Sequence, residues 1–210
     1  LQEDLHILEV PMPDDHILHN RRSALFTALA VSGVAAATIL DAHASPLSLG
    51  SAAGAAEAPG DFDFLVGRWN VRHSKLRKRL AGSTDWDDFA GTCVNWPLLG
   101  GQGNVDDNLL HTPQGAYRGV GVRAFDPVAG AWSIWWLDSR DPGRMDVPVR
   151  GGFRDGVGTF VADDLFEDRP IRMRFTWSKI TPTTAHWEQA FSPDGGASWE
   201  VNWRMDFARQ

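Results

Sequence analysis

The segment from Trp135 to Asp146 holds the residues whose types and spacing best suit ligand binding. Two tryptophans in a row supply apolar surface, and four charges of mixed sign follow within the next eight residues. Apolar walls with a few polar groups at their edge are the usual composition of a small-molecule site, and arginines can hold a carboxylate through paired hydrogen bonds. We therefore expect a ligand site formed by Trp135, Trp136, Asp138, Arg140 and Arg144.

The alternative for this segment is a surface turn whose charges pair with one another, because exposed ion pairs are common and contribute only about 0–1 kcal/mol each. Two more residues could reach the same site from neighbouring strands. His73 has the alternation parity of Trp69, and Arg123 shares a face with Trp136. Both are secondary ligand-binding candidates, and for His73 the alternative is a buried histidine satisfied by hydrogen bonds.

Metal and cofactor chemistry find little support in the sequence. Asp106, Asp107 and Asn108 carry oxygen ligands, but consecutive strand residues point to opposite faces, so we expect this run in a loop or cap. The single cysteine, Cys93, excludes an intramolecular disulfide and a metal site built on several thiolates. We predict no metal and no cofactor, and no residue is assigned a catalytic role.

The charge balance argues against a nucleic-acid partner. The formal net charge is −7, and residues 1–44 hold six acids and two arginines, which leaves 21 acids against 18 bases in the remainder. Nucleic-acid binding requires a clear local excess of lysine and arginine.

The elements that would position these residues are β-strands. From Trp69 onward apolar residues alternate with a period of two, and turn signals recur about every ten to fifteen residues. We expect strands at 68–74 and 86–96, a loop over a barrel end at 98–104, and a solvated basic connection at 75–79.

The clearest hairpin spans residues 117–137. Pairing Phe125 with Trp132 across its proline- and glycine-containing turn sets the register. The pairs that follow are Gly119–Asp138, Gly121–Trp136, Val120–Leu137 and Val122–Trp135. Both faces of this hairpin carry large apolar groups, so we expect a loop, a ligand or a second subunit to cover the outer one.

A second hairpin closes at Ser192–Trp199, which has the Ser-x-Asp-x-Gly-x-x-Trp pattern of an Asp-box turn. One copy of this pattern is a structural turn and not an active site. Placing Ser192 opposite Ser198 gives the pairs Trp187–Trp203, Glu188–Asn202 and His186–Arg204. The residues expected inside the barrel are Trp69, Phe175, Trp177, Trp187, Val201 and Trp203.

The N-terminal part resembles a leader. In residues 1–44 paired arginines precede an uncharged, alanine-rich run to Leu40, and Ala-His-Ala follows at 42–44, typical of a twin-arginine export signal and its cleavage site. We expect a periplasmic or extracellular protein, with a flexible Ala/Gly/Ser linker at 45–60 and a folded domain at 61–210. A retained membrane anchor is the alternative for the leader.

Two motifs resemble the uncharacterised DUF1579 family: Phe-Leu-x-Gly-x-Trp at 64–69 and Phe-Ser-x-Asp-Gly-Gly-x-x-Trp-Glu at 191–200. The resemblance spans about residues 61–209. This family is similar to lipocalins and other calycins, so the resemblance implies a single antiparallel up-and-down β-barrel. Lipocalins often stack an arginine on the tryptophan of Gly-x-Trp, which implies Arg209, or with less favourable parity Arg204, over Trp69. The family brings no established catalytic residues, and the motif of heme-binding calycins is absent from the sequence.

Binding of a small, largely apolar or amphiphilic molecule is the favoured function, because alternation places most acids and bases outside the barrel. A lyase, isomerase or hydrolase is the alternative, and it would need a titratable interior group with a partner. The partners expected are therefore a small-molecule ligand and, through the outer face of the 117–137 hairpin, a second copy in a homodimer. A membrane partner is expected only if the leader is retained.

Overall fold

The computed structural model describes residues 59–210. The predicted export signal at 1–44 and most of the predicted linker at 45–60 lie outside the described residues. Within residues 59–210, no helix has the length and apolar character needed to cross a bilayer.

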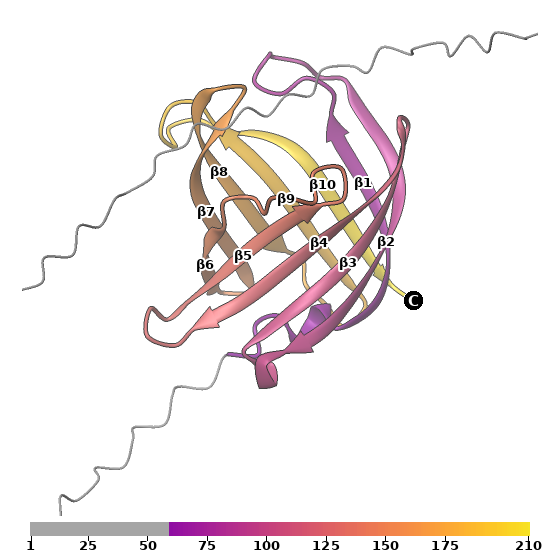
Figure 1. Ribbon diagram of the computed structural model, residues 1–210, viewed down its shortest axis with the longest axis vertical. Helices are drawn as coiled ribbons and strands as arrows, with labels where there is room; N and C mark the ends of the chain where they lie inside the picture. Colours follow the sequence, from indigo (N-terminus) through magenta and orange to yellow (C-terminus); the bar gives the residue numbers. More distant parts are fainter. Residues whose placement is uncertain (1–58) are drawn as a thin grey trace, which may run out of the picture. The chain divides into compact units, whose positions relative to one another are not determined.

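Ten antiparallel strands close into one barrel (Figure 1). Each strand pairs with its neighbours in sequence, and β1 also pairs with β10, so the order around the barrel is up-and-down. The strands are β1 (Gly67–Leu76), β2 (Trp86–Leu98), β3 (Gly103–Thr112), β4 (Gly115–Asp126), β5 (Ala131–Asp138), β6 (Val149–Arg154), β7 (Val157–Phe166), β8 (Arg169–Ser178), β9 (Thr184–Ser192) and β10 (Glu200–Arg209). The predicted all-β class and single antiparallel barrel are confirmed.

The β4–β5 hairpin has the register that its turn residues predict. Phe125 pairs with Trp132, and the four pairs that follow along the strands are those expected from the sequence. Because side chains alternate between the two faces, this register sends Trp136 and Asp138 into the barrel and Trp135 out of it.

The expected loop or cap at residues 106–108 is wrong. These residues lie in the middle of β3, where Asp106 and Asn108 are buried inside the barrel and Asp107 lies on the outer wall. Opposite faces for consecutive residues are indeed observed. A strand accommodates this run because the inward carboxylate and amide are hydrogen-bonded, and buried polar groups are tolerated when they are hydrogen-bonded.

The register expected for the second hairpin is also wrong. The register shifts between Val201 and Trp203, so Glu188 pairs with Arg204 and Trp187 with Met205. The shift places Asn202 at a β-bulge, and its side chain is fully buried. A bulge inserts one extra residue that alternation along a single strand does not reveal. The Asp-box segment itself forms the expected structural turn, with the Ser192 and Ser198 hydroxyls both donating to the Asp194 carboxylate.

The end of the barrel at which β1 begins, here called the closed end, is covered by the 3-10 helix η1 (Asp63–Leu65), drawn in indigo in Figure 1. Trp69 donates its indole N–H to the carbonyl of Leu65 at 2.8 Å. The Arg209 guanidinium lies 4.2 Å from the centre of the Trp69 ring and donates to two carbonyls of the same segment. Of the two arginines that the family resemblance implies, Arg209 therefore makes the stack.

Gly67 is required at this closed end. Its φ of +121° is a conformation that L side chains rarely adopt, and a Cβ there would lie 2.8 Å from the Arg209 guanidinium. The loop expected at 98–104 covers the same end, where the 3-10 helix η2 (Leu99–Gly101) connects β2 to β3.

Candidate functional site

The two ends of the barrel differ in how much their inward side chains contact solvent. At the closed end, four inward aromatic residues are 0–2% exposed, namely Trp69, Trp132, Phe160 and Trp177, whereas Phe125 and Phe153 at the same end are partly buried. At the opposite end, here called the mouth, Tyr117 and Phe191 are buried, whereas the inward residues Trp136, Asp138, Asp164 and Phe166 are only partly buried. A molecule entering the barrel therefore meets accessible apolar surface at the mouth.

Three tryptophans form the aromatic wall inside the mouth. The ring of Trp203 lies edge-on to Trp136 at 6.3 Å and to Trp187 at 5.6 Å, measured between ring centres. Trp136 fits because its diagonal neighbour on β4 is glycine: a Cβ at Gly119, the partner of Asp138, would overlap the indole ring. Edge-to-face contacts of this kind fix ring orientation in addition to excluding water. Of the two tryptophans predicted to bind ligand, only Trp136 faces this wall.

Asp138 and Arg140 lie at the mouth and are joined to each other. Two guanidinium nitrogens of Arg140 donate to the two Asp138 carboxylate oxygens at 2.9 and 2.7 Å. Partial burial alone would raise the pKa of Asp138, but hydrogen bonds from the Arg140 side chain and backbone outweigh it and lower that pKa below its usual value. The same guanidinium lies 3.9 Å from the ring centre of Tyr117, an inward residue of β4. Burial in turn raises the pKa of Tyr117 to about 12.

Two cations at the mouth are absent from the predicted site. The expectation of a solvated connection at 75–79 is wrong for Lys75, which follows His73 in the inward parity of β1 and lies 4.4 Å from the Trp203 ring centre. The guanidinium of Arg79 lies over two further aromatic rings of the mouth, those of Phe166 and Phe191, at 5.6 and 5.8 Å. Continuing the period-two pattern by one step beyond His73 identifies Lys75. Nothing in the local sequence identifies Arg79, because its position depends on the path of the loop.

The remaining residues of the 135–146 segment are not brought into the mouth by the observed contacts. Trp135 points outward from β5, opposite Val122. Arg144 forms an ion pair with Asp141 at 3.1 Å. The alternative of charges that pair within the turn therefore describes the ion pairs of Arg140 and Arg144, while the inward position of Trp136 and Asp138 fits the ligand-site hypothesis.

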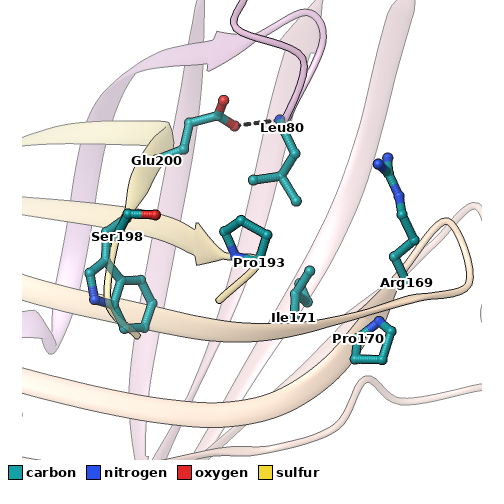
Figure 2. Close-up of a pocket in the computed structure, with 8 residues that line it drawn as sticks. Leu80, Arg169, Pro170, Ile171, Pro193, Ser198 and Glu200 are labelled. Atoms are coloured by element: carbon teal, nitrogen blue, oxygen red, sulfur yellow. Dashed lines mark hydrogen bonds between the residues drawn. The ribbon is translucent and has the colours of Figure 1, made fainter. Parts of the chain in front are cut away.

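A groove of about 330 Å³ lies at the same end of the barrel (Figure 2). Its walls are mostly apolar and include Leu80, Pro170, Ile171, Pro193 and Trp199. Figure 2 shows Arg169 and Glu200 on opposite sides of the groove, and the Glu200 carboxylate accepts a hydrogen bond from the backbone N–H of Leu80 at 2.7 Å. The volume is in the range of small-ligand pockets, which starts at about 300 Å³. None of the residues predicted from the sequence lines it.

Arg123 lies deeper in the barrel, in a buried polar cluster. Its guanidinium forms an ion pair with Asp106 and donates to the Asn104 side chain at 3.0 Å. Asp106 also accepts from the Asn108 amide and from the backbone N–H of Gly121. The Arg123 side chain is 7% exposed and that of Asp106 is 3% exposed, so neither reaches the mouth. The cluster joins β3 to β4 and neutralises its own charges.

His73 is a core histidine. It is 1% exposed, stacks on Phe89 with ring centres 4.7 Å apart, and its Nδ1 accepts a hydrogen bond from the Trp203 indole at 3.3 Å. Burial, assisted by the nearby charge of Lys75, lowers the pKa of His73 from 6.5 to about 4. The imidazole is therefore neutral at physiological pH, which matches the alternative interpretation of a satisfied buried histidine.

Among residues 59–210 no three His, Cys, Asp or Glu side chains are grouped so as to hold a metal ion. Burial raises the pKa of the Cys93 thiol well above its usual value, so this cysteine is a protonated core residue.

Comparison with known proteins identifies no family. No protein-family model matches the chain, and no curated protein sequence matches it. Among solved structures, the chain is similar to a barrel described as "De novo design of a fluorescence-activating beta barrel", with 14% sequence identity and a TM-score of 0.41, over 72% of this chain and 99% of that chain. Membership of the DUF1579 family stays a prediction.

Proposed function

We propose that this barrel binds a small, anionic amphiphile at its mouth. The apolar part of the molecule would lie against the aromatic wall of the mouth, of which Trp136 is partly exposed, and in the groove at the same end of the barrel. Its anionic group would lie among the cations that cover this wall. Export, which is expected from the leader, is compatible with such a site.

The observation that carries the proposal is the position of three cations over inward aromatic rings at one end of the barrel. Lys75 lies over Trp203, Arg140 over Tyr117 and Arg79 over a phenylalanine pair, each within 6 Å of a ring centre. Cation–π contacts of this kind hold the charges at the edge of an apolar surface. An amphiphile with a carboxylate or sulfonate meets complementary chemistry at both of its ends there.

The enzyme alternative has less support. A lyase, isomerase or hydrolase would need an interior acid or base with a free face toward substrate. His73 is held between a stacked ring and an indole N–H, and the oxygens of Asp106 already accept hydrogen bonds from three groups. These contacts describe core residues and not a proton-transfer pair.

Two fluorescent probes test the proposal, because they share one apolar body and differ in charge. We expect 1-anilinonaphthalene-8-sulfonate to bind the full chain more tightly than N-phenyl-1-naphthylamine, which lacks the sulfonate. The double variant R79Q/R140Q should weaken sulfonate binding by at least about tenfold, equivalent to about 1.4 kcal/mol, and leave binding of the neutral probe within about twofold.

The double variant R72Q/R204Q is the matched control. Both arginines point outward from the barrel, and Arg204 also lies over an aromatic ring, 4.4 Å from the ring centre of Trp86. The control removes the same charge from the outer wall and should leave both affinities unchanged. Equal loss in the two double variants, or equal affinity for the two probes, would refute an anion-selective mouth.

A further inference from the structure

The outer wall of the barrel is divided into an apolar part and a charged part. On β2 to β5, Trp96, Val105, Val122 and Trp135 are successive cross-strand partners and form one continuous row. The next row contains Val94, Val120 and Leu137. All seven point outward, and Trp96 remains 48% exposed. We call these two rows the apolar face.

The outer wall on the other side of the barrel has the composition of an ordinary solvated surface. There Arg204 of β10 forms an ion pair with Glu188 of β9 at 3.4 Å, and His186 is hydrogen-bonded to Asp206 at 2.6 Å. The apolar face is therefore a local feature of four strands. Contiguous apolar surface of this kind on a folded domain marks an interaction site.

We propose that the apolar face is the interface of a symmetric homodimer. Asp107 lies in the second row, between Val94 and Val120, and Arg118 lies at the edge of the face; the two are joined by two hydrogen bonds at 3.0 and 2.6 Å. In a two-fold interface the same patch meets itself, so a patch with charge of one sign would repel its copy, whereas an acid and a base in one patch are self-complementary. Two sheet faces with outward apolar rows can interdigitate at a separation of about 10 Å.

The size of the face sets the expected strength of the dimer. Four strands spaced about 4.8 Å apart, with about four residues each at about 3.3 Å, cover on the order of 250 Å². Stable protein interfaces bury about 800 Å² per partner, and smaller ones are weak or transient. The face is therefore too small for an obligate dimer, and the dimer that we propose is weak and reversible.

A bilayer surface fits the face less well. Binding to anionic membranes is driven by clusters of lysine and arginine, whereas residues 45–210 carry 21 acids against 18 bases, and the base at the edge of the face, Arg118, is paired with an acid. An aromatic side chain such as Trp96 suits both a protein partner and a membrane interface, so the experiment must separate the two occupants.

Sedimentation equilibrium of the full chain at several concentrations tests the proposal. We expect a monomer–dimer equilibrium that V122K, which places a charge at the centre of the face, weakens by at least tenfold. T176K is the matched control, because Thr176 is also outward and partly buried, but lies on the charged wall of β8. The variant T176K should dimerise as strongly as the unmodified chain does. Far-ultraviolet circular dichroism and thermal melting establish that both variants are folded.

The proposal is overturned if the unmodified chain is monomeric up to about 1 mM, or if V122K dimerises as strongly as T176K. Cosedimentation with phosphatidylcholine vesicles provides the second measurement. Binding of monomeric protein to the vesicles that V122K abolishes and T176K retains would assign the face to a membrane and also overturn the dimer.

Discussion

Protonation of His73 should make the stability of this protein depend on pH in a range where most other groups do not titrate. The pKa of the buried imidazole is lowered from 6.5 to about 4, chiefly by burial and secondarily by the charge of Lys75. In the unfolded chain the imidazole regains its usual pKa, so between about pH 6.5 and pH 4 the unfolded state binds more protons than the folded state. The stabilisation from neutral His73 is therefore complete above pH 6.5 and is lost as the pH falls.

The magnitude follows from the difference between the two pKa values. Each pH unit of difference corresponds to 1.36 kcal/mol, so the full effect is about 3 kcal/mol, of which about 2 kcal/mol should be lost between pH 6.5 and pH 5. Urea unfolding across this range measures the loss. The variant H73N keeps an oxygen acceptor for the Trp203 indole N–H but cannot be protonated. Between pH 6.5 and pH 5 its free energy of unfolding should therefore fall by about 2 kcal/mol less than that of the unmodified chain.

A histidine at the surface provides the control. His111 is exposed near the end of β3, so H111N should retain the full pH dependence. Equal slopes for H73N and the unmodified chain, or an imidazole signal of His73 that titrates above pH 6 by NMR, would show that the side chain is not sealed in the core. A titration near pH 7 would also restore His73 as a candidate general base, since catalytic bases have pKa values near the working pH.

Two further predictions concern pairs of neighbouring positions with opposite environments. D106A leaves a buried guanidinium without its carboxylate and should lower the free energy of unfolding in urea by about 3–5 kcal/mol. D107A breaks an exposed ion pair and should lower it by about 0–1 kcal/mol. Equal losses would contradict the assignment of Asp106 to the interior. G119A forces a methyl group into the ring of Trp136 and should destabilise by about 1–3 kcal/mol, whereas G152A meets no atom within 4 Å and should be neutral or slightly stabilising. A neutral G119A would mean that the indole ring is free to move away from β4.

Much of the barrel was predictable because the relevant information is local. A turn with proline and glycine between Phe125 and Trp132 determines the β4–β5 register, and alternation then assigns Trp136 to the interior without any knowledge of distant strands. The inward position of His73 follows in the same way from Trp69. The identity of the tryptophan-stacking arginine came from a family resemblance, and the structure decided between its two candidates in favour of Arg209.

The candidate site was predicted in part. The segment 135–146 contributes Trp136, Asp138 and Arg140 to the mouth, but the groove and the cation at Arg79 come from loops whose path depends on strands far apart in the sequence. The charge and the aromatic character of a side chain are known from the residue type alone. The sequence does not predict whether a cation lies over a particular ring, because the two groups come from different elements.

The amino-acid sequence by itself determined the period-two pattern, the hairpin register at Phe125–Trp132 and the inward parity of His73, because backbone geometry couples neighbouring residues within a strand and across a tight turn. Only the tertiary structure decided three features: that Asp106 and Arg123 neutralise each other inside the barrel, that a bulge buries Asn202, and that one barrel end is closed while the other is accessible. The first two features lie within single hairpins, β3–β4 and β9–β10, but they depend on hydrogen bonds of buried polar groups and on a bulge, which alternation along one strand does not reveal. The third depends on closure of the barrel by β1 and β10, whose separation in the sequence carries no information about their contact.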